Sequence, residues 1–111
     1  MVIKRIKGDT VDLDIQLFDV NDVEINLTGT TVFFTVKRNL QDADSEALIS
    51  KDITSFASPT TGDVAITLTA SDVDYIGTFY YDIKIKYTNG KIQSVLNDKF
   101  ILSDHVTIRT S

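Results

Sequence analysis

Four segments of this chain alternate apolar and polar residues with a period of two, and this pattern limits the folds open to it. In the segment 11–17, valine, leucine and isoleucine occupy the odd positions, and Asp12, Asp14 and Gln16 occupy the even ones. Successive side chains of a β-strand point to opposite faces, so this segment is predicted to be a strand with one buried and one wet face. The same alternation occurs in the segments 32–36, 64–68 and 79–87.

Weaker strand patterns fill the gaps between these segments. The chain holds 13 isoleucines, 10 valines and 14 threonines among its 111 residues, and such β-branched residues favour pleated sheets. Together the segments predict an all-β fold: an immunoglobulin-like antiparallel β-sandwich of seven to nine short strands, with residues 1–111 as a single domain. A barrel is the alternative. The weaker strand candidates are the segments 2–6, 23–27, 48–55, 91–96, 99–102 and 106–108.

Short polar segments predict how these strands are joined. Asn89-Gly90 lies between two strand segments and predicts a hairpin with a type I′ turn, whose two central residues both need positive φ. Residues 19–22 predict a second hairpin. Asn97-Asp98 interrupts a strand pattern, and we expect a β-bulge there. A capping pattern that includes Thr69 and Asp72 predicts one helical turn over residues 70–76.

The composition excludes several classes of chemistry and partner. With no cysteine and only one histidine, the chain has no disulfide, no cysteine-based zinc site and no thiol nucleophile. The formal net charge is −5 and the basic residues are scattered, whereas nucleic-acid binding needs a basic face. No apolar run exceeds three residues, far short of the roughly 20 that a spanning helix needs. We therefore expect no cofactor, no nucleic-acid partner and no membrane span.

Three groups of polar residues have alternative chemical and structural interpretations. The string Ser103-Asp104-His105 contains the residue types of a catalytic triad, but neighbouring strand side chains point to opposite faces. We interpret its histidine as a surface residue. The acidic clusters at 19–24 and 42–46 have oxygen ligands at spacings that suit Ca²⁺, although neither has the glycine and distal glutamate of an EF-hand. Because Asp and Asn also stabilise turns, we favour turn formation over calcium binding.

Three aromatic residues lie outside the predicted core faces. By alternation, Phe18, Phe33 and Tyr80 sit opposite the apolar faces of their strands. Any one of them could be an ordinary second-layer packing residue, but three on outward faces favour a contact surface, because aromatic residues are enriched at interface cores. A sugar-binding platform would also use aromatic residues, usually including tryptophan, which the chain lacks. We therefore predict that these three residues form an interaction surface.

Several segments, taken in order along the chain, carry a family resemblance. They are Gly8-Asp9-Thr10 with the strand that ends in Leu17-Phe18-Asp19, the run 25–37 with its Leu27-Thr28-Gly29 turn, the segments 49–54 and 68–72, the run 77–84, and the closing segment 99–102. In this order they resemble the N-terminal β-sandwich domain of bacteriophage baseplate upper proteins and related small tail proteins. The resemblance covers nearly the whole chain and contains no catalytic motif.

The resemblance implies a non-enzymatic structural protein of a phage or prophage virion, made in the bacterial cytoplasm and assembled into the baseplate or tail. Its expected partners are other tail or baseplate proteins, and such domains also form oligomeric rings or trimers of their own. They often open a longer protein, so the chain is either a small stand-alone tail protein or part of a longer one. A carbohydrate- or host-receptor-binding module on the same fold is the alternative function.

Overall fold

The part of the chain that the structure describes folds into seven β-strands joined by turns and loops. The computed structural model describes residues 2–39 and 41–104, so His105 and the predicted strand at 106–108 lie outside it. Two short 3₁₀ turns, η1 (Asp44–Glu46) and η2 (Pro59–Thr61), interrupt the strand order. The strands are β1 (Ile3–Ile6), β2 (Val11–Gln16), β3 (Thr31–Lys37), β4 (Ile49–Ile53), β5 (Asp63–Leu68), β6 (Gly77–Lys86) and β7 (Ile92–Ser103).

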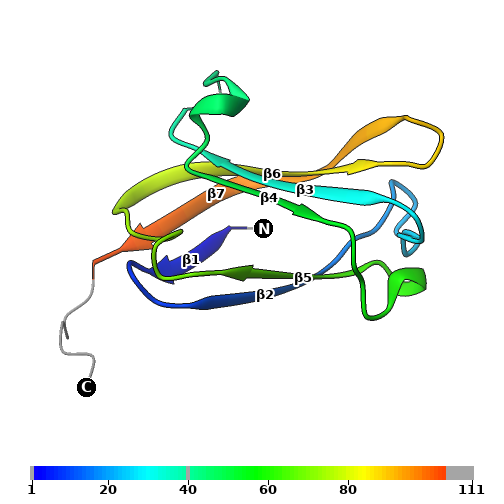
Figure 1. The fold of residues 1–111 in the computed structure, drawn as a ribbon, viewed down its shortest axis with the longest axis horizontal. Helices are drawn as coiled ribbons and strands as arrows, with labels where there is room; N and C mark the ends of the chain where they lie inside the picture. The colour runs from blue at the N-terminus through cyan, green and yellow to red at the C-terminus, as the bar shows by residue number, and fades with distance from the viewer. Residues whose placement is uncertain (1, 40, 105–111) are drawn as a thin grey trace.

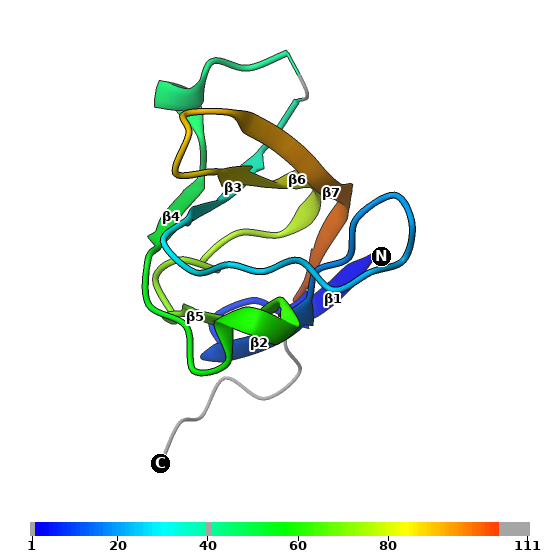
Figure 2. The same ribbon diagram turned by 90° about the vertical axis from the view of Figure 1, so that its right-hand side faces the viewer.

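The strands form two unequal sheets. The larger sheet has five strands in the order β1-β7-β6-β3-β4, and the smaller consists of β2 paired with β5. Figures 1 and 2 show the smaller sheet beneath the larger one, which curls so that its β1 edge comes down toward β2. The predicted all-β sandwich is therefore confirmed. One pair departs from the antiparallel rule, since β1 runs parallel to β7.

The alternating segments bury the side chains that their period predicts. Every second residue of β2, β3 and β5 is buried, and β6 follows the same rule from Phe79 to Ile85. Phe34 and Phe100 are fully buried. The ring of Phe34 lies 5.8 Å from that of Tyr81 and 6.3 Å from that of Phe100, between centroids. Such aromatic pairs stabilise the fold by about 0.5–1.5 kcal/mol each, beyond the stabilisation from burying their surface.

The predicted strand at 23–27 is wrong, although its alternation is correct. Ile25 and Leu27 are buried as the pattern requires, but their backbone groups bond to different partners. The N–H of Ile25 donates to the carbonyl of Leu17 (3.1 Å), and that of Leu27 donates to the carbonyl of Pro59 (2.8 Å). No single neighbour forms a ladder with this segment, which makes only one isolated bridge, between Phe18 and Glu24.

The β6–β7 hairpin is where it was predicted, but its turn is of another kind. The N–H of Gly90 donates to the carbonyl of Tyr87 (3.0 Å), and the N–H of Tyr87 donates to the carbonyl of Lys91 (2.8 Å). Gly90 has a φ of 87°, whereas Asn89 is not in the positive-φ region. A type I′ turn needs both, so that prediction is wrong. The chain uses instead a three-residue loop with a left-handed last residue.

The predicted hairpin at 19–22 uses the same loop. The N–H of Asp22 donates to the carbonyl of Asp19 (3.0 Å), and the N–H of Asp19 donates to the carbonyl of Val23 (2.9 Å). Asp22 takes the position of Gly90 with a φ of 61°, and no other non-glycine residue in the described ranges has a positive φ. Aspartate is one of the few residues that tolerate this conformation, at a cost that glycine avoids.

Two further local predictions need correction. Residues 70–73 form a turn rather than a helical turn over 70–76. The reciprocal capping bonds do form, because the N–H of Thr69 donates to Asp72 Oδ2 (2.8 Å) and the N–H of Asp72 donates to Thr69 Oγ1 (3.3 Å). The helix does not continue, since the carbonyl of Val73 accepts the N–H of Gly8 (3.1 Å) instead of one from a following turn.

The β-bulge lies at Val95, not at Asn97-Asp98. The register of β6 against β7 shifts where Ile83 faces Leu96 while Lys84 faces Ser94, which leaves Val95 as the extra residue. Val95 and Leu96 are adjacent, yet both pack against the core. Two neighbours on a regular strand would point to opposite faces, so the bulge lets both apolar side chains reach the interior.

An ion pair ties the larger sheet to the end of the smaller one. Lys51 Nζ on β4 lies 2.9 Å from Asp72 Oδ2, in the turn that follows β5. Partial burial acts to raise the pKa of Asp72, but the hydrogen bonds from Lys51 and Thr69 outweigh it and hold this pKa below its ordinary value. The carboxylate is therefore more favourable in the folded chain than in the unfolded one.

Candidate interaction surface

The outer face of the five-stranded sheet carries two of the three predicted aromatic residues. Phe33 on β3 and Tyr80 on β6 are each half-buried and point away from the core. In the register, Phe33 stands beside Lys84, and Tyr80 stands between Lys37 and Lys99. Because Lys84 and Tyr80 are four residues apart on one strand, the two aromatic residues are offset by about 13 Å along the strand direction, on neighbouring strands.

Around Phe33 the face is hollowed into a shallow depression. Phe33 stands between Asp52 of β4 and Lys84 of β6. Ile92, at the start of β7, is 61% exposed and brings a second apolar group to the same depression. The lining residues are Phe33, Thr35, Ser50, Asp52, Asp82, Lys84 and Ile92.

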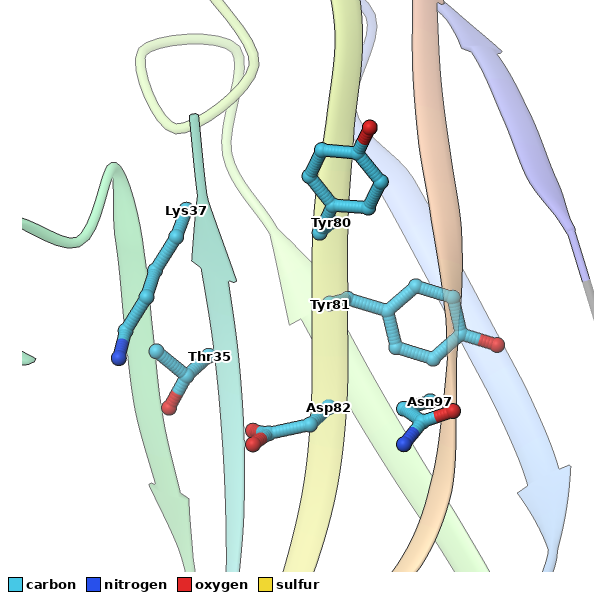
Figure 3. Close-up of a pocket in the computed structure, with 6 residues that line it drawn as sticks. All are labelled: Thr35, Lys37, Tyr80, Tyr81, Asp82 and Asn97. Atoms are coloured by element: carbon cyan, nitrogen blue, oxygen red, sulfur yellow. The ribbon is translucent and has the colours of Figure 1, made fainter. Parts of the chain in front are cut away.

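Around Tyr80 lies a second depression, with polar groups beside the aromatic ring. Figure 3 shows Tyr80 and Asp82 on β6, with Thr35 and Lys37 on the neighbouring strand β3. Asp82 faces Thr35 on one side and Asn97 on the other, so a polar row separates Tyr80 from Phe33. Both depressions therefore belong to one continuous face, in which two aromatic patches flank a strip of hydrogen-bonding groups. The residues lining the second depression are Thr35, Lys37, Tyr80, Tyr81, Asp82 and Asn97.

Phe18 belongs to a different part of the surface. It lies two residues after the end of β2 and is 44% exposed. In the same segment Val20 is 90% exposed and Val23 is 56% exposed. The sequence reasoning grouped Phe18 with Phe33 and Tyr80, but the structure places it on the 18–23 loop and not on the five-stranded sheet. The three residues do not form one patch.

The fold makes the Tyr81 hydroxyl a much weaker acid. Its ring is buried beside Phe34, while its residue also lines the depression in Figure 3. Burial and, secondarily, the charge of Asp98 raise the pKa of Tyr81 to about 12. This phenol therefore stays protonated well above neutral pH and serves as a fixed polar group, not as a base.

The acidic cluster at 19–24 shows turn chemistry. Asp19 Oδ1 accepts hydrogen bonds from the N–H groups of Asn21 (2.8 Å) and Val23 (3.0 Å). Gln16 Nε2 donates to Glu24 Oε1 (3.3 Å) at the loop's base. The Asp19 carboxylate thus stabilises the loop by accepting hydrogen bonds from the loop's backbone, as expected for an Asx turn.

The other two candidate groups each include a side chain that the structure does not describe, Asp44 in one and His105 in the other. In the second cluster, Asp42 Oδ2 accepts the N–H of Asn39 (3.1 Å). Among the described side chains of residues 2–39, 41–43 and 45–104, no three of His, Cys, Asp or Glu are arranged to hold a metal ion. Ser103 and Asp104 are exposed at the end of β7, and the histidine of this string lies outside the described residues. No helix within the described ranges is long and apolar enough to span a membrane.

At one end of the sandwich, the guanidinium group of Arg38 lies over two aromatic rings, a contact that the sequence did not predict. The guanidinium carbon of Arg38 lies 5.6 Å from the ring centre of Tyr75 and 5.9 Å from that of Phe79. The two rings meet edge to face, with centroids 6.3 Å apart. Residues 38, 75 and 79 are distant in sequence, and Arg38 sits just past an alternating strand, so no local pattern signals this contact.

Comparisons with known proteins bear on the fold. No family model matches the chain, and no curated protein matches it. Among solved structures, the chain is similar to the N-terminal domain of phage TP901-1 ORF48, with a TM-score of 0.64 and 16% sequence identity. The similarity covers 93% of this chain and 85% of that one. It confirms the sequence resemblance at the level of the fold, since the similar structure is the N-terminal domain of a phage protein.

Proposed function

We propose that this chain is a non-enzymatic structural component of a bacteriophage or prophage virion, in the baseplate or tail. It acts by contact with other tail or baseplate proteins. The observation that carries the proposal is the match in fold to a phage protein domain over 93% of the chain. The order of turn and strand motifs supports it independently, because it resembles baseplate upper proteins.

The outer face of the five-stranded sheet supports a role in protein contact. It presents Phe33 and Tyr80, each half-buried, beside a polar strip. Aromatic residues set among hydrogen-bonding groups are typical of interface cores, where a few of them supply most of the binding energy. The depressions are shallow, so this face suits another protein surface better than an enclosed small molecule.

The remaining parts of the proposal follow from this role. The protein is made in the bacterial cytoplasm and ends in the virion, as one domain over residues 1–111. It needs no cofactor, binds no nucleic acid and has no membrane span.

Virion incorporation tests the role directly. A tagged copy is expressed during phage production, and purified particles are examined by immunogold electron microscopy and quantitative mass spectrometry. We expect the tag on the tail or baseplate at a fixed copy number. Absence of the protein from purified particles would refute the proposal.

A variant pair then tests the surface. Phe33→Ala/Tyr80→Ala is compared with Thr31→Ala/Thr78→Ala, which changes two threonines on the same sheet face. Loss of about 2 kcal/mol at an aromatic contact lowers incorporation about 30-fold, whereas the threonine pair is incorporated normally. Equal incorporation of both folded variants would move the contact away from this face and leave the virion role standing.

The depression in Figure 3 favours one alternative, a carbohydrate- or host-receptor-binding module. The half-buried ring of Tyr80, next to Asp82 and Asn97, offers both a stacking surface and hydrogen-bonding groups. Glycan-array binding by the purified chain tests this function. Saturable, sugar-specific binding that Tyr80→Ala abolishes and Thr78→Ala preserves would establish it, and an array without signal would exclude it.

A further inference from the structure

The two sheets present outer faces of opposite charge. Alternation and register place five lysines on the outer face of the five-stranded sheet, and we call this set the lysine face. Two aspartates share it, Asp52 and Asp82, so its formal charge is 5 − 2 = +3. This is unexpected in a chain with a net charge of −5. The lysines are Lys4, Lys37, Lys84, Lys86 and Lys99.

The outer face of the two-stranded sheet has the opposite character, and we call it the aspartate face. Asp12 and Asp14 on β2 and Asp63 on β5 point outward from it, and its other outward residues are uncharged. Its formal charge is therefore −3. Thr67 Oγ1 donates to Asp12 Oδ1 (3.1 Å), and Thr61 Oγ1 donates to Asp63 Oδ2 (2.8 Å), which orients two of the three carboxylates.

The aspartate face is also shaped to accept a long cationic side chain. A depression of about 380 Å³ opens along its edge. Asp14 and Asp63 line it together with the half-buried ring of Phe56 and the small side chain of Ala65. A lysine combines a terminal charge with an apolar stem, and such a side chain fits a site with carboxylates beside an aromatic ring.

We propose that the aspartate face of one copy of this chain docks on the lysine face of a second copy. The formal charges of +3 and −3 match, and the two faces lie on opposite sides of the sandwich (Figure 2). Each copy therefore uses a different face for each neighbour. Such a head-to-tail contact produces a ring when the rotation between neighbours closes, and a filament when it does not. The inference does not depend on the phage role.

The size of the faces sets the strength of the contact. A two-stranded face of six residues measures about 10 by 20 Å, or about 200 Å² per partner. Stable interfaces bury about 800 Å² per partner, so we expect weak, reversible association with a Kd of about 1 mM or somewhat below. Because opposite charges supply the attraction, the association weakens as salt rises.

Sedimentation of the purified chain at rising concentration tests this proposal. In low salt, the weight-average mass is expected to rise with concentration, and at about 0.5 M salt it stays at that of the monomer, because the Debye length there is only a few ångströms. Asp12→Lys/Asp14→Lys reverses the aspartate face, and Lys84→Glu/Lys86→Glu reverses the lysine face. Each variant alone should remain monomeric in low salt.

The mixture of the two variants is the decisive sample. The first variant keeps its lysine face and the second keeps its aspartate face, so a 1:1 mixture should recover association through one unaltered contact. The control matched to the first variant is Glu46→Lys/Asp74→Lys, which changes the net charge by the same amount as Asp12→Lys/Asp14→Lys, at exposed residues outside both faces. It should associate like the unaltered chain.

Three results would overturn the proposal: an unaltered chain that stays monomeric in low salt up to about 3 mM, well above the expected Kd, a mixture that does not associate, or a control that loses association as fully as the face variants. Circular dichroism shows that each variant is folded. If Asp12→Lys unfolds the chain by breaking its bond to Thr67, Asp14→Lys alone provides the same test, since Asp14 faces Ala65 across the sheet.

Discussion

Gly62→Ala tests a close backbone approach that holds the 17–25 segment against the smaller sheet. Gly62 precedes β5, is buried, and has a φ of 76°. Its carbonyl accepts the N–H of Leu17 (2.8 Å). A Cβ at this position would lie 2.5 Å from the carbonyl oxygen of Leu17, and 3.1 and 3.2 Å from the backbone oxygen and nitrogen of Ile25.

Gly8 provides a matched control for the magnitude. Its φ of 80° is nearly the same, but a Cβ there would meet nothing within 4 Å. In both variants the alanine must adopt a left-handed conformation, which costs about 1–2 kcal/mol of stability. Only Gly62→Ala must also push backbone apart, a form of overpacking that costs about 1–3 kcal/mol. We therefore expect losses of about 1–2 kcal/mol for Gly8→Ala and about 2–5 kcal/mol for Gly62→Ala.

Urea unfolding followed by circular dichroism measures both losses. At this chain length, 1 kcal/mol corresponds to about 4 °C in Tm, so the two variants should also differ clearly in a thermal scan. The slope of free energy against urea should stay unchanged, because the same surface is exposed on unfolding. Equal destabilisation by both alanines would refute the argument, since the close approach at Gly62 would then contribute nothing.

Three more predictions follow from single residues. Asp22→Gly should stabilise the chain by about 1 kcal/mol in urea unfolding, because it removes a left-handed non-glycine residue; unchanged or lower stability would contradict this. The lowered pKa of Asp72 predicts stability that is fully present above its unfolded pKa of about 3.9 and is lost as pH falls through the folded value. In acid titrations of stability from about pH 5 downward, both Asp72→Asn and Lys51→Met should flatten this loss. An unchanged slope would exclude the ion pair as its source. Tyr81→Phe should remove the tyrosinate absorbance step near pH 12, together with the alkaline loss of stability between about pH 10 and 12; a step that persists would mean that another group causes it.

The alternating strands were predictable because their burial depends on local order. Where polar residues occupy every second position, as in the segment 11–17, only one strand orientation hides the apolar set. The same logic failed at 23–27, where Ile25 and Leu27 are buried but bond to the separate partners Leu17 and Pro59. Alternation reports which side chains are inside, and it does not report whether one neighbouring strand accepts the backbone.

The candidate surface shows the same limit. Alternation correctly placed Phe33 and Tyr80 off the core face, because that depends on neighbours in sequence. It could not show that Phe18 lies on a different surface, nor that Arg38 covers Tyr75, because both depend on how distant segments are paired. That Phe33 and Tyr80 belong to a contact surface stays a prediction, which the Phe33→Ala/Tyr80→Ala variant tests. A contact at Phe18 is a separate prediction.

The parallel pair of β1 and β7 has a consequence for how this protein is made. Ile3 faces Phe100 in that pair, so β1 leaves the ribosome 97 residues before the segment with which it pairs. At typical synthesis rates of about 5–20 residues per second, the wait is about 5–20 s. During that time β1 exposes a bare edge, and its Lys4 and Arg5 are charges of the kind that discourage pairing with another nascent chain. The larger sheet can thus be completed only after β7 has been made.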